Sequence, residues 1–302
     1  MSEAVRLAER VAATDANVLI TGESGTGKDA LALFIHGKSR RSSAPLVKID
    51  CAALPGGLLE AELFGYERGA FTSATGSKPG RLEAAEKGTL VLDEIAHFSV
   101  DAQAKVLRVI ERREFERLGG RRTIKVDARL IALTNVDLEE AVKRRDFRED
   151  LFYRLNVVHI GLPPLRKRQE DLARLAQHFV ETYSTKHGRK ATSVSAEALG
   201  VLRTYDFPGN VRELANVIER AVIVSDAKRI EPSNLPESIR AAVQVLERKK
   251  KPLLLAQVEA EYIAETLTAA GGNKTKAARM LGISRKNLYE RLARTQSGRD
   301  ED

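Results

Sequence analysis

The chain has 302 residues, 43% of them hydrophobic and 30% charged, so we expect a globular protein with two or three domains. No segment approaches the roughly 18 apolar residues of a membrane-spanning helix, and the single cysteine, Cys51, excludes an internal disulfide and suits a reducing cytoplasm. The net charge of +8 suggests a polyanionic partner, whereas the lack of tryptophan gives little support for stacking on single-stranded nucleic acid.

The first predicted elements are a helix, a strand and a glycine-rich turn. The helix is expected over 1–16, the apolar run 18–20 predicts a buried strand, and 30–35 predict a second helix after the turn. Strand, glycine-rich turn and helix are the context of a phosphate-binding P-loop. An ordinary glycine-rich turn is the alternative. The candidate nucleotide-binding residues are Gly22, Glu23, Ser24, Gly25, Thr26, Gly27, Lys28 and Asp29.

Two residues of this turn have distinct expected roles. Lys28 would reach the β- and γ-phosphates as a positive charge. Asp29 stands where most P-loops carry Ser or Thr, so the usual hydroxyl ligand for Mg²⁺ is missing.

Three further apolar runs predict strands with polar residues at their ends. The runs are 45–50, 88–94 and 128–135, and they end in Asp50, in Asp93 with Glu94, and in Asn135. Open α/β sheets place ligand groups at such strand ends. We interpret Asp93 as a Mg²⁺ ligand and Glu94 as the group that orients or deprotonates the attacking water. Asn135 would bond to the γ-phosphate or to that water, with strand capping as its alternative role.

A helix and a segment of small residues lie between these strands. Residues 58–65 predict a helix that ends at Gly65, and residues 69–76 follow it. The composition of this segment is typical of a mobile surface loop, with Phe71 packed into the core. A helix is also expected over 102–111.

Residues 147–155 predict a charged helix that carries Arg148 and Arg154. Arginine suits bidentate contacts with phosphate, and one that reached a neighbouring subunit's site would be an arginine finger. Taken alone, the two residues are better explained by surface ion pairs. The strand expected at 157–160 contains His159, which we interpret as structural.

Two adjacent prolines at 163–164 mark the end of the first domain, and residues 166–240 read as all-helical. Asn210 is expected to cap a helix over 210–225. Arg212 lies in the first turn of that helix, where the dipole disfavours a cation. This position suggests a bound anion such as a nucleotide phosphate, or else a salt bridge with an acid such as Glu213.

The C-terminal part predicts a linker and a small helical domain. A basic run followed by Pro252 predicts a linker over 241–252, and the domain would cover 253–302. Two short helices, at 274–281 and 285–293, are separated by a turn containing a glycine, as in a helix-turn-helix. The alternative is a helical hairpin for oligomer contact. The candidate DNA-binding residues are Lys274, Thr275, Ser284, Arg285, Lys286, Asn287 and Arg291.

Several motifs in series make a family resemblance specific. They are GESGTGK at 22–28, LFGYERGAFTSA at 63–74, GTLVLDEI at 88–95, FREDLFYRLNVV at 147–158, FPGNVREL at 207–214 and NKTKAARMLGISRKNLYERL at 273–292. Together they closely resemble the bacterial enhancer-binding proteins, which are AAA+ ATPases that activate transcription by sigma-54 RNA polymerase.

The resemblance implies a fold and a mechanism. It implies an α/β fold with a P-loop AAA+ parallel sheet over 1–165, an all-helical lid over 166–240, and a Fis-type helix-turn-helix that binds upstream double-stranded DNA. It also implies ATP and Mg²⁺ as cofactors, and a cytoplasmic ring of subunits, with a hexamer expected.

The resemblance also implies roles for single residues. Thr134 and Asn135 would sense the γ-phosphate, Arg148 and Arg154 would act on the neighbouring subunit's site, and Arg212 would be the sensor of the lid. It places Phe71 at the tip of a loop that touches sigma-54, in place of a core position. The expected sigma-factor contacts are Gly69, Ala70, Phe71, Thr72, Ser73 and Ala74.

Three departures from the family pattern stand out. Ser73 replaces a glycine of the loop and is expected to stiffen its tip. Asp50 replaces an asparagine that restrains the catalytic glutamate in the family. It is expected to repel Glu94 and to alter the coupling between the nucleotide state and the surface loop. No regulatory domain precedes the ATPase in this sequence, which suggests either a form without one or control by a partner protein in trans.

Two alternative functions remain open on the sequence. One is a DNA-binding regulator that keeps the AAA+ fold for ATP binding and oligomerisation, without remodelling sigma-54. The other is a general AAA+ remodeller of proteins, which the loop and the Fis-like end disfavour.

Overall fold

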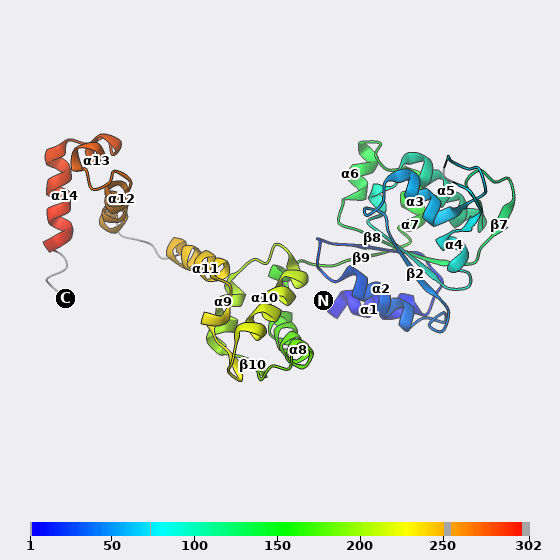
Figure 1. The fold of residues 1–302 in the computed structure, drawn as a ribbon, viewed down its shortest axis with the longest axis horizontal. Coiled ribbons are helices and arrows are strands. Elements are labelled where there is room, and N and C mark those ends of the chain that lie inside the picture. The colour runs from blue at the N-terminus through cyan, green and yellow to red at the C-terminus, as the bar shows by residue number, and fades with distance from the viewer. Residues whose placement is uncertain (1, 73, 251–254, 298–302) are drawn as a thin grey trace. The chain divides into compact units, whose positions relative to one another are not determined.

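The computed structural model describes residues 2–72, 74–250 and 255–297, which form two compact units, Met1–Arg240 and Ala241–Asp302. The larger unit is built on a parallel sheet of five strands in the order β2–β5–β8–β1–β9 (Figure 1). The strands are β1 (Val18–Thr21), β2 (Leu46–Asp50), β5 (Thr89–Asp93), β8 (Arg129–Thr134) and β9 (Val158–Gly161). The central strands are apolar along nearly their whole length because helices cover both faces of the sheet.

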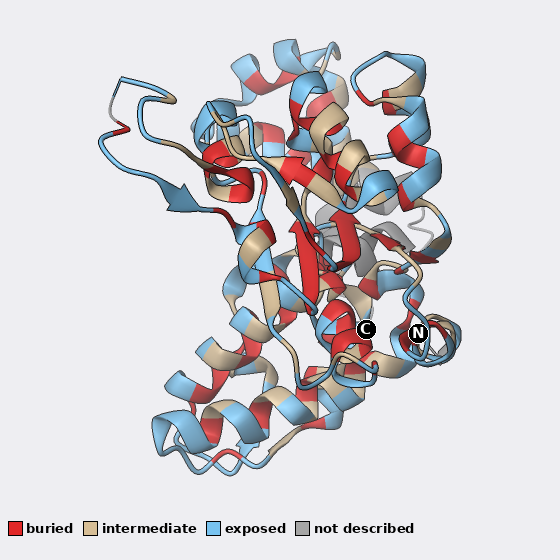
Figure 2. Ribbon diagram, turned by 90° about the vertical axis from the view of Figure 1, so that its right-hand side faces the viewer, coloured by how far each residue is buried: buried red, intermediate tan, exposed pale blue. Residues whose placement is uncertain are grey.

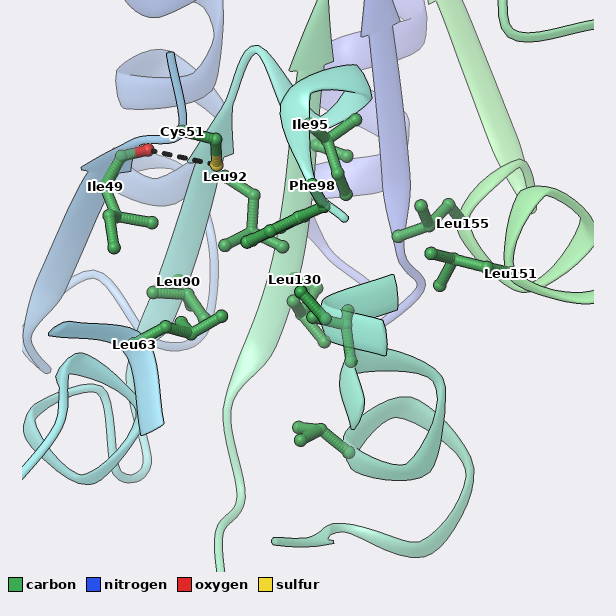
Figure 3. Close-up of a cluster of buried hydrophobic side chains, with 14 of the residues drawn as sticks. Ile49, Cys51, Leu63, Leu90, Leu92, Ile95, Phe98, Leu130, Leu151 and Leu155 are labelled. Atoms are coloured by element: carbon green, nitrogen blue, oxygen red, sulfur yellow. Dashed lines mark hydrogen bonds between the residues drawn. The ribbon is translucent and has the colours of Figure 1, made fainter. Parts of the chain in front are cut away.

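Different helices cover the two faces of the sheet. One face packs against α1 (Ser2–Ala12) and α2 (Lys28–Gly37), and the other against α3 (Gly56–Phe64), α5 (Val100–Arg112) and α7 (Glu149–Leu155). Figure 2 shows buried residues along the strands and exposed residues on the outer faces of the helices. In Figure 3, the core on the second face is visible as leucines of β5 and β8 beside leucines of α3 and α7, namely Leu90, Leu92, Leu130, Leu63 and Leu151.

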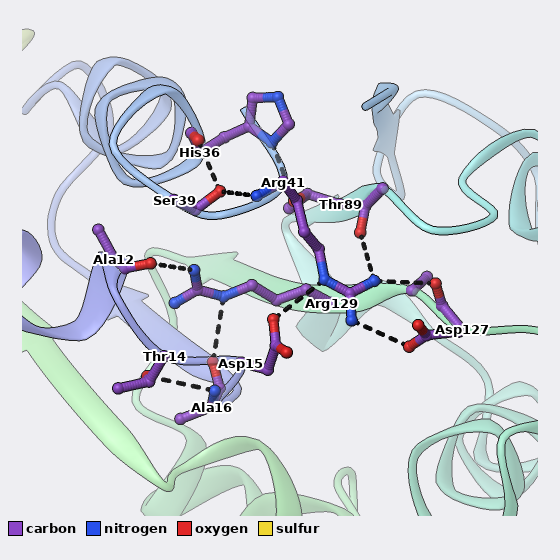
Figure 4. A network of polar contacts seen from close by, with 12 residues as sticks. Ala12, Thr14, Asp15, Ala16, His36, Ser39, Arg41, Thr89, Asp127 and Arg129 are labelled. Atoms are coloured by element: carbon purple, nitrogen blue, oxygen red, sulfur yellow. Dashed lines mark hydrogen bonds and ion pairs between the residues drawn. The ribbon is translucent and has the colours of Figure 1, made fainter. Parts of the chain in front are cut away.

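A buried arginine connects α1 to the sheet. Arg129 on β8 is only 1% exposed, and its guanidinium donates hydrogen bonds to the carbonyl oxygens of Val11 (2.9 Å), Ala12 (3.2 Å) and Ala16 (3.3 Å). These carbonyls lie at and just after the C-terminal end of α1, where helix carbonyls lack intrahelical partners. Beside it, Arg41 pairs with two aspartates (Figure 4).

Two small antiparallel hairpins lie at the edge of this unit. The first joins β3 (Gly65–Tyr66) to β4 (Lys78–Pro79), and the second joins β6 (Glu114–Glu116) to β7 (Thr123–Lys125). The shorter helices α4 (Arg81–Ala84) and α6 (Leu138–Lys143) and the 3-10 turns η1 (Ile95–His97) and η2 (Leu165–Lys167) complete the α/β part.

The lid is helical, but it also contains a small sheet that the sequence analysis did not anticipate. Its helices are α8 (Gln169–His187), α9 (Ala196–Thr204) and α10 (Asn210–Val224), and a 3-10 turn, η3, spans Pro232–Asn234. The strands β10 (Ser193–Val194) and β11 (Arg229–Ile230) pair in parallel. The expectation of an all-helical segment was therefore wrong at these four residues, which are too few for a periodicity signal.

The start of α10 and the expected linker also differ from the sequence analysis. Gly209, and not Asn210, is the N-cap of α10, because the Asn210 amide oxygen accepts the Leu165 N–H at 2.8 Å instead of capping its own helix. The segment expected as a linker is largely helical, since α11 covers Glu237–Lys250. Residues 251–254 lie outside the described residues.

Among the described residues of the second unit, the three helices that follow α11 pack around a small core. They are α12 (Leu255–Ala269), α13 (Lys274–Met280) and α14 (Arg285–Ser297). Asn273 caps α13 as predicted, because its side chain accepts the N–H groups of Thr275 and Lys276. The core contains the expected residues Ala277, Leu281, Ile283, Leu288 and Leu292, together with Ile263 and Ala270 of the preceding helix and the turn after it.

Candidate nucleotide-binding site

The glycine-rich turn connects β1 to α2 in a conformation that requires glycine. Gly25 and Gly27 have φ angles of +76° and +102°, which side chains rarely adopt. A Cβ atom on Gly25 would also lie 2.3 Å from the carbonyl oxygen of Gly209 in the lid. The turn is therefore shaped both by its own backbone and by close contact with the lid.

Lys28 is the first residue of α2 and is only 7% exposed. Its ammonium group donates hydrogen bonds to the carbonyl oxygens of Gly22 (2.8 Å) and Glu23 (3.4 Å), and it lies 3.8 Å from Glu94 Oε1. The amine thus points back across the turn, toward the place where a P-loop holds phosphates.

Polar residues follow the ends of β2, β5 and β8, as predicted. Glu94 has a positive φ of 55°, and its Oε2 accepts the Asn135 N–H at 3.2 Å. Asp50 lies opposite Asp93 in the register of the two strands, and its carboxylate accepts the Ala52 N–H at 3.0 Å. The expected effect of Asp50 on the coupling between the nucleotide state and the surface loop stays a prediction.

The carboxylates at this edge share a lysine that the sequence analysis did not identify. The ammonium group of Lys48 on β2 pairs with Asp29, and it lies 2.8 Å from Asp93 Oδ2. Burial lowers the pKa of Lys48, but hydrogen bonds to the two aspartates outweigh this effect and leave it raised. Burial and the charges of Asp50, Asp93 and Glu94 raise the pKa of the neighbouring Cys51 thiol.

The lid contacts the turn through a set of polar side chains. Arg166 forms a bidentate ion pair with Glu23, at 2.6 and 2.9 Å. The Asn210 amide nitrogen donates to Glu23 Oε2 (3.1 Å) and to the Ser24 carbonyl (3.0 Å), and Arg212 donates to Ser24 Oγ (3.0 Å). The sequence analysis identified only Arg212. Arg166 lies two positions after the adjacent prolines, and nothing near it in the sequence indicates Glu23, which lies 143 positions away.

The Glu23 carboxylate should make stability depend on pH. Hydrogen bonds from Arg166 and Asn210 lower its pKa from 4.5 to about 2. Because the pKa of Glu23 is lowered in the folded state, the contribution of its charged carboxylate to stability is complete above pH 4.5 and is lost as the pH falls through 2. We expect the difference in melting temperature between the wild type and Glu23→Gln to shrink over this window. Glu181→Gln is the matched control for replacing a carboxylate on the surface, and a difference for Glu23→Gln that does not change with pH would contradict the assignment.

The residues around the turn fit a nucleotide. A cavity of about 260 Å³ combines Lys28, Arg212 and the start of α2, which suit phosphates, with apolar side chains of the lid, which suit a ring. Its lining residues are Ser24, Gly25, Gly27, Lys28, Asp29, Ala30, Glu94, Phe179, Val211, Arg212 and Ala215. Asn135 instead lines a second cavity, of about 370 Å³, with Thr21 and His159.

The donor atoms also fit Mg²⁺ in the way this metal accompanies nucleotides. Asp29 and Asp93 provide carboxylate oxygens, which Mg²⁺ prefers. Among the described residues, no group of three or more His, Cys, Asp and Glu side chains could hold a metal ion by itself. A Mg²⁺ ion here would therefore share its coordination with phosphate and water oxygens.

Besides Asn135, the predicted residues Thr134, Arg148 and Arg154 do not line the cavity around Lys28. Thr134 is fully buried, and its hydroxyl oxygen accepts the Val136 N–H at 3.0 Å. Arg148 immediately precedes α7 and pairs with Asp150, and Arg154 on α7 pairs with Glu111. Both arginines are partly exposed, and neither lines the cavity around Lys28.

The surface loop begins at the first hairpin. Phe71 is 37% exposed, and its ring meets Tyr66 edge-on at 4.9 Å between centroids, so the core position expected from composition was wrong. Gly69 and Ala74 close the loop through an N–H to carbonyl hydrogen bond of 2.9 Å. Ser73 lies outside the described residues, so its expected effect stays a prediction.

The predicted DNA-binding residues lie at the starts of α13 and α14 and on the second turn of α14. Lys274, Thr275, Ser284, Arg285 and Lys286 are exposed. Two others are engaged within the unit, because Arg291 donates to the Asn287 side chain at 2.8 Å and also pairs with Glu259. The exposed group is therefore better placed for direct contact with DNA.

Comparison with known protein families shows to which family the chain belongs. Residues 1–161, more than half of the chain, match the family described as the sigma-54 interaction domain. The chain belongs to the sigma-54 interaction domain family. Residues 166–252 match an AAA+ ATPase lid domain, which extends through the segment expected as a linker, and residues 254–294 match the Fis family of bacterial regulatory proteins.

The two relatives described here are longer than this chain. It is 49% identical over 292 residues to the regulatory protein AtoC of Escherichia coli K12, covering 94% of this chain and 63% of AtoC. It is 44% identical over 308 residues to the transcriptional regulatory protein FlbD of Caulobacter vibrioides, covering 97% of this chain and 68% of FlbD. The chain therefore spans about two-thirds of the length of these relatives.

A solved structure supports the fold. The crystal structure of NtrX from Brucella abortus in complex with ATP has a TM-score of 0.73 and 34% identity, and the match covers 97% of this chain and 67% of that one. The predicted P-loop AAA+ fold with a lid and a C-terminal helix-turn-helix is confirmed. In the part of the chain that the structure describes, no helix is long and apolar enough to cross a membrane.

Proposed function

We propose that the chain hydrolyses ATP in a ring of subunits and uses this reaction to remodel sigma-54 RNA polymerase bound at a promoter. The observation that carries the proposal is one cavity that brings together Lys28, Asp29, Glu94 and the lid's Arg212. Family membership and the structure of NtrX with ATP support ATP as the nucleotide.

Each side chain has a role in this reaction. Lys28 and the N–H groups of the turn would hold the phosphates, and Asp93 with Asp29 would hold Mg²⁺, which neutralises charge on the transferring phosphoryl group. Glu94 would orient the attacking water and accept its proton. Asn135 donates its backbone N–H to Glu94, so it would connect the state of the phosphate to the position of that carboxylate.

The proposed ring explains two arginines that lie outside the cavity of their own subunit. Arg148 and Arg154 would reach the site of the neighbouring subunit and stabilise charge in the transition state. Tyr153 and Val157 on and just after α7 are 65% and 60% exposed, and they would be covered by that neighbour. These exposed apolar side chains stand on either side of Arg154 in the chain and support a contact between subunits there.

The remaining parts would join this motor to its partners. The loop at residues 69–74 would contact sigma-54, and the starts of α13 and α14 would bind upstream double-stranded DNA through the phosphates and base edges of the major groove. A regulatory protein acting in trans is a further proposed partner.

The first experiment measures ATP turnover and the formation of sigma-54 open complexes in the same preparation. Appearance of both activities would support the proposal. Turnover without open complexes would favour the alternative, a DNA-binding regulator with an AAA+ fold. Absence of turnover at every protein concentration would contradict the catalytic assignments.

Phe71→Ala should separate the two activities. Because Phe71 is exposed in the loop of the first hairpin and does not line the cavity around Lys28, ATP turnover should persist while open-complex formation falls by about tenfold or more, as for an aromatic anchor of an interface. Val100→Ala removes an exposed apolar side chain from α5 and is the matched control, with both activities unchanged. Open complexes at the wild-type level in Phe71→Ala would exclude this loop as the sigma-54 contact.

A further inference from the structure

Lys48 lies between two carboxylates of the candidate nucleotide site. It is the third residue of the edge strand β2, and its ammonium group pairs both with Asp29 on α2 and with Asp93 at the end of β5. Successive side chains of a strand point to opposite faces, and this one reaches the face covered by α2. One cation thus joins three separate elements beside the phosphate site.

The other lysine of the site is engaged elsewhere. Lys28 donates to the carbonyl oxygens of Gly22 and Glu23, and its nearest carboxylate is that of Glu94, at 3.8 Å. The Asp93 side chain is only 15% exposed, and a carboxylate so far removed from water requires a partner. Among the ion pairs of the described residues, Lys48 is that partner.

The charges predict two opposite effects of Lys48 on nucleotide binding. Without a divalent cation, Asp29, Asp93 and Glu94 face the negative phosphates, and Lys48 reduces their repulsion. With a divalent cation, the same ammonium group occupies Asp93 Oδ2, an oxygen that we assign as a metal ligand. Lys48 therefore favours binding of the nucleotide without a metal ion and opposes binding of the metal ion.

We propose that Lys48 is a resident counter-cation of Asp29 and Asp93 that sets how strongly nucleotide binding depends on Mg²⁺. The inference rests on the nucleotide-binding function proposed above. Lys48 leaves Asp93 when that oxygen serves the metal, and it returns when the metal departs with the product. It is a positioning residue, since it acts on the nucleotide through the two aspartates.

The test compares the affinity of the full chain for ADP in excess Mg²⁺ and in EDTA, measured by calorimetry. Lys48→Met keeps the length of the side chain and removes its charge. We expect the ratio of the dissociation constant in EDTA to that in Mg²⁺ to rise about fivefold or more, because the unit charge that pairs with Asp29 and Asp93 is lost. Bound Mn²⁺, followed by electron paramagnetic resonance in the presence of ADP, should show tighter binding in the variant.

Three further variants make the result decisive. Lys48→Arg keeps the charge and should retain the wild-type ratio, and Lys48→Gln is a second neutral replacement that should behave as Lys48→Met does. Lys143→Met breaks a lysine–glutamate pair on the surface of α6 and should leave both constants unchanged.

Two results would overturn the inference. Equal weakening of ADP binding in Mg²⁺ and in EDTA, which leaves the ratio unchanged, would mean that Lys48 contacts phosphate or only supports the fold. Two dissociation constants that both stay at the wild-type value would mean that it has no role in binding. In both cases the wild type still binds ADP. Failure of the wild type to bind ADP under either condition would instead refute the proposed function.

Discussion

Glu94→Gln should lower the rate of ATP hydrolysis about 100- to 10,000-fold, the range expected for loss of a general base. The glutamine keeps the size of the side chain and its place at the left-handed turn after β5, where the backbone φ is 55°. It cannot accept a proton from water, and it no longer attracts the Lys28 ammonium, which lies 3.8 Å away in the wild type. ADP binding should remain close to the wild-type level because the phosphate-binding groups are unchanged.

Steady-state turnover and ADP calorimetry on the same samples check this prediction. Glu197→Gln, on the exposed first turn of α9, is the matched control and should leave both quantities unchanged. A loss of less than tenfold in Glu94→Gln would show that another group activates the water. Loss of ADP binding together with turnover would show that Glu94 holds the site together and does not act as the base.

Arg129→Met should lower the free energy of unfolding of the larger unit by about 3 kcal/mol. The substitution keeps an unbranched side chain in the core, but it removes the donor from the carbonyl oxygens of Ala12 and Ala16, at about 1–3 kcal/mol for each. The Val11 carbonyl also loses its bond to Arg129 but keeps the N–H and hydroxyl of Thr14 as donors. Part of this cost is offset because the variant no longer buries a charged guanidinium away from water. The unfavourable burial of this charge is also the reason that the pKa of Arg129 is lowered. The remaining loss falls on the contact between α1 and β8.

Urea unfolding followed by circular dichroism measures this effect, since the chain has no tryptophan. Arg122→Met, an exposed arginine next to β7, is the control and should change the unfolding free energy by no more than about 0.5 kcal/mol. A change of less than about 1 kcal/mol in Arg129→Met would show that the cost of burying the charge cancels the three hydrogen bonds.

Features that depend on neighbouring residues were predictable from the sequence. The strands of the sheet appear as apolar runs because helices bury both of their faces, and this leaves an unbroken pattern in the chain. Asp93, Glu94 and Asn135 were identified because each directly follows such a run. Asn273 was identified as a helix cap because its hydrogen bonds go to residues two and three positions away.

Predictions from the sequence were wrong where a distant partner competes with a local rule. Asn210 has the residue type of an N-cap, but its amide bonds to Leu165, Glu23 and Ser24, which lie 45 to 187 positions away. Phe71 was assigned to the core from composition, whereas the structure leaves it partly exposed beside Tyr66.

The sequence by itself therefore determined the order of the elements, the phosphate-binding turn and the residues that follow the strands, because each of these depends on patterns within about ten positions. Only the tertiary structure decided which lysine or arginine forms an ion pair with which carboxylate. Lys48 reaches Asp29 and Asp93 because parallel pairing places β2 beside β5 while α2 covers the same face, and Arg166 reaches Glu23 because the lid folds back on the turn. Ion pairs depend on distance in space, and the spacing of residues along a chain does not encode that distance.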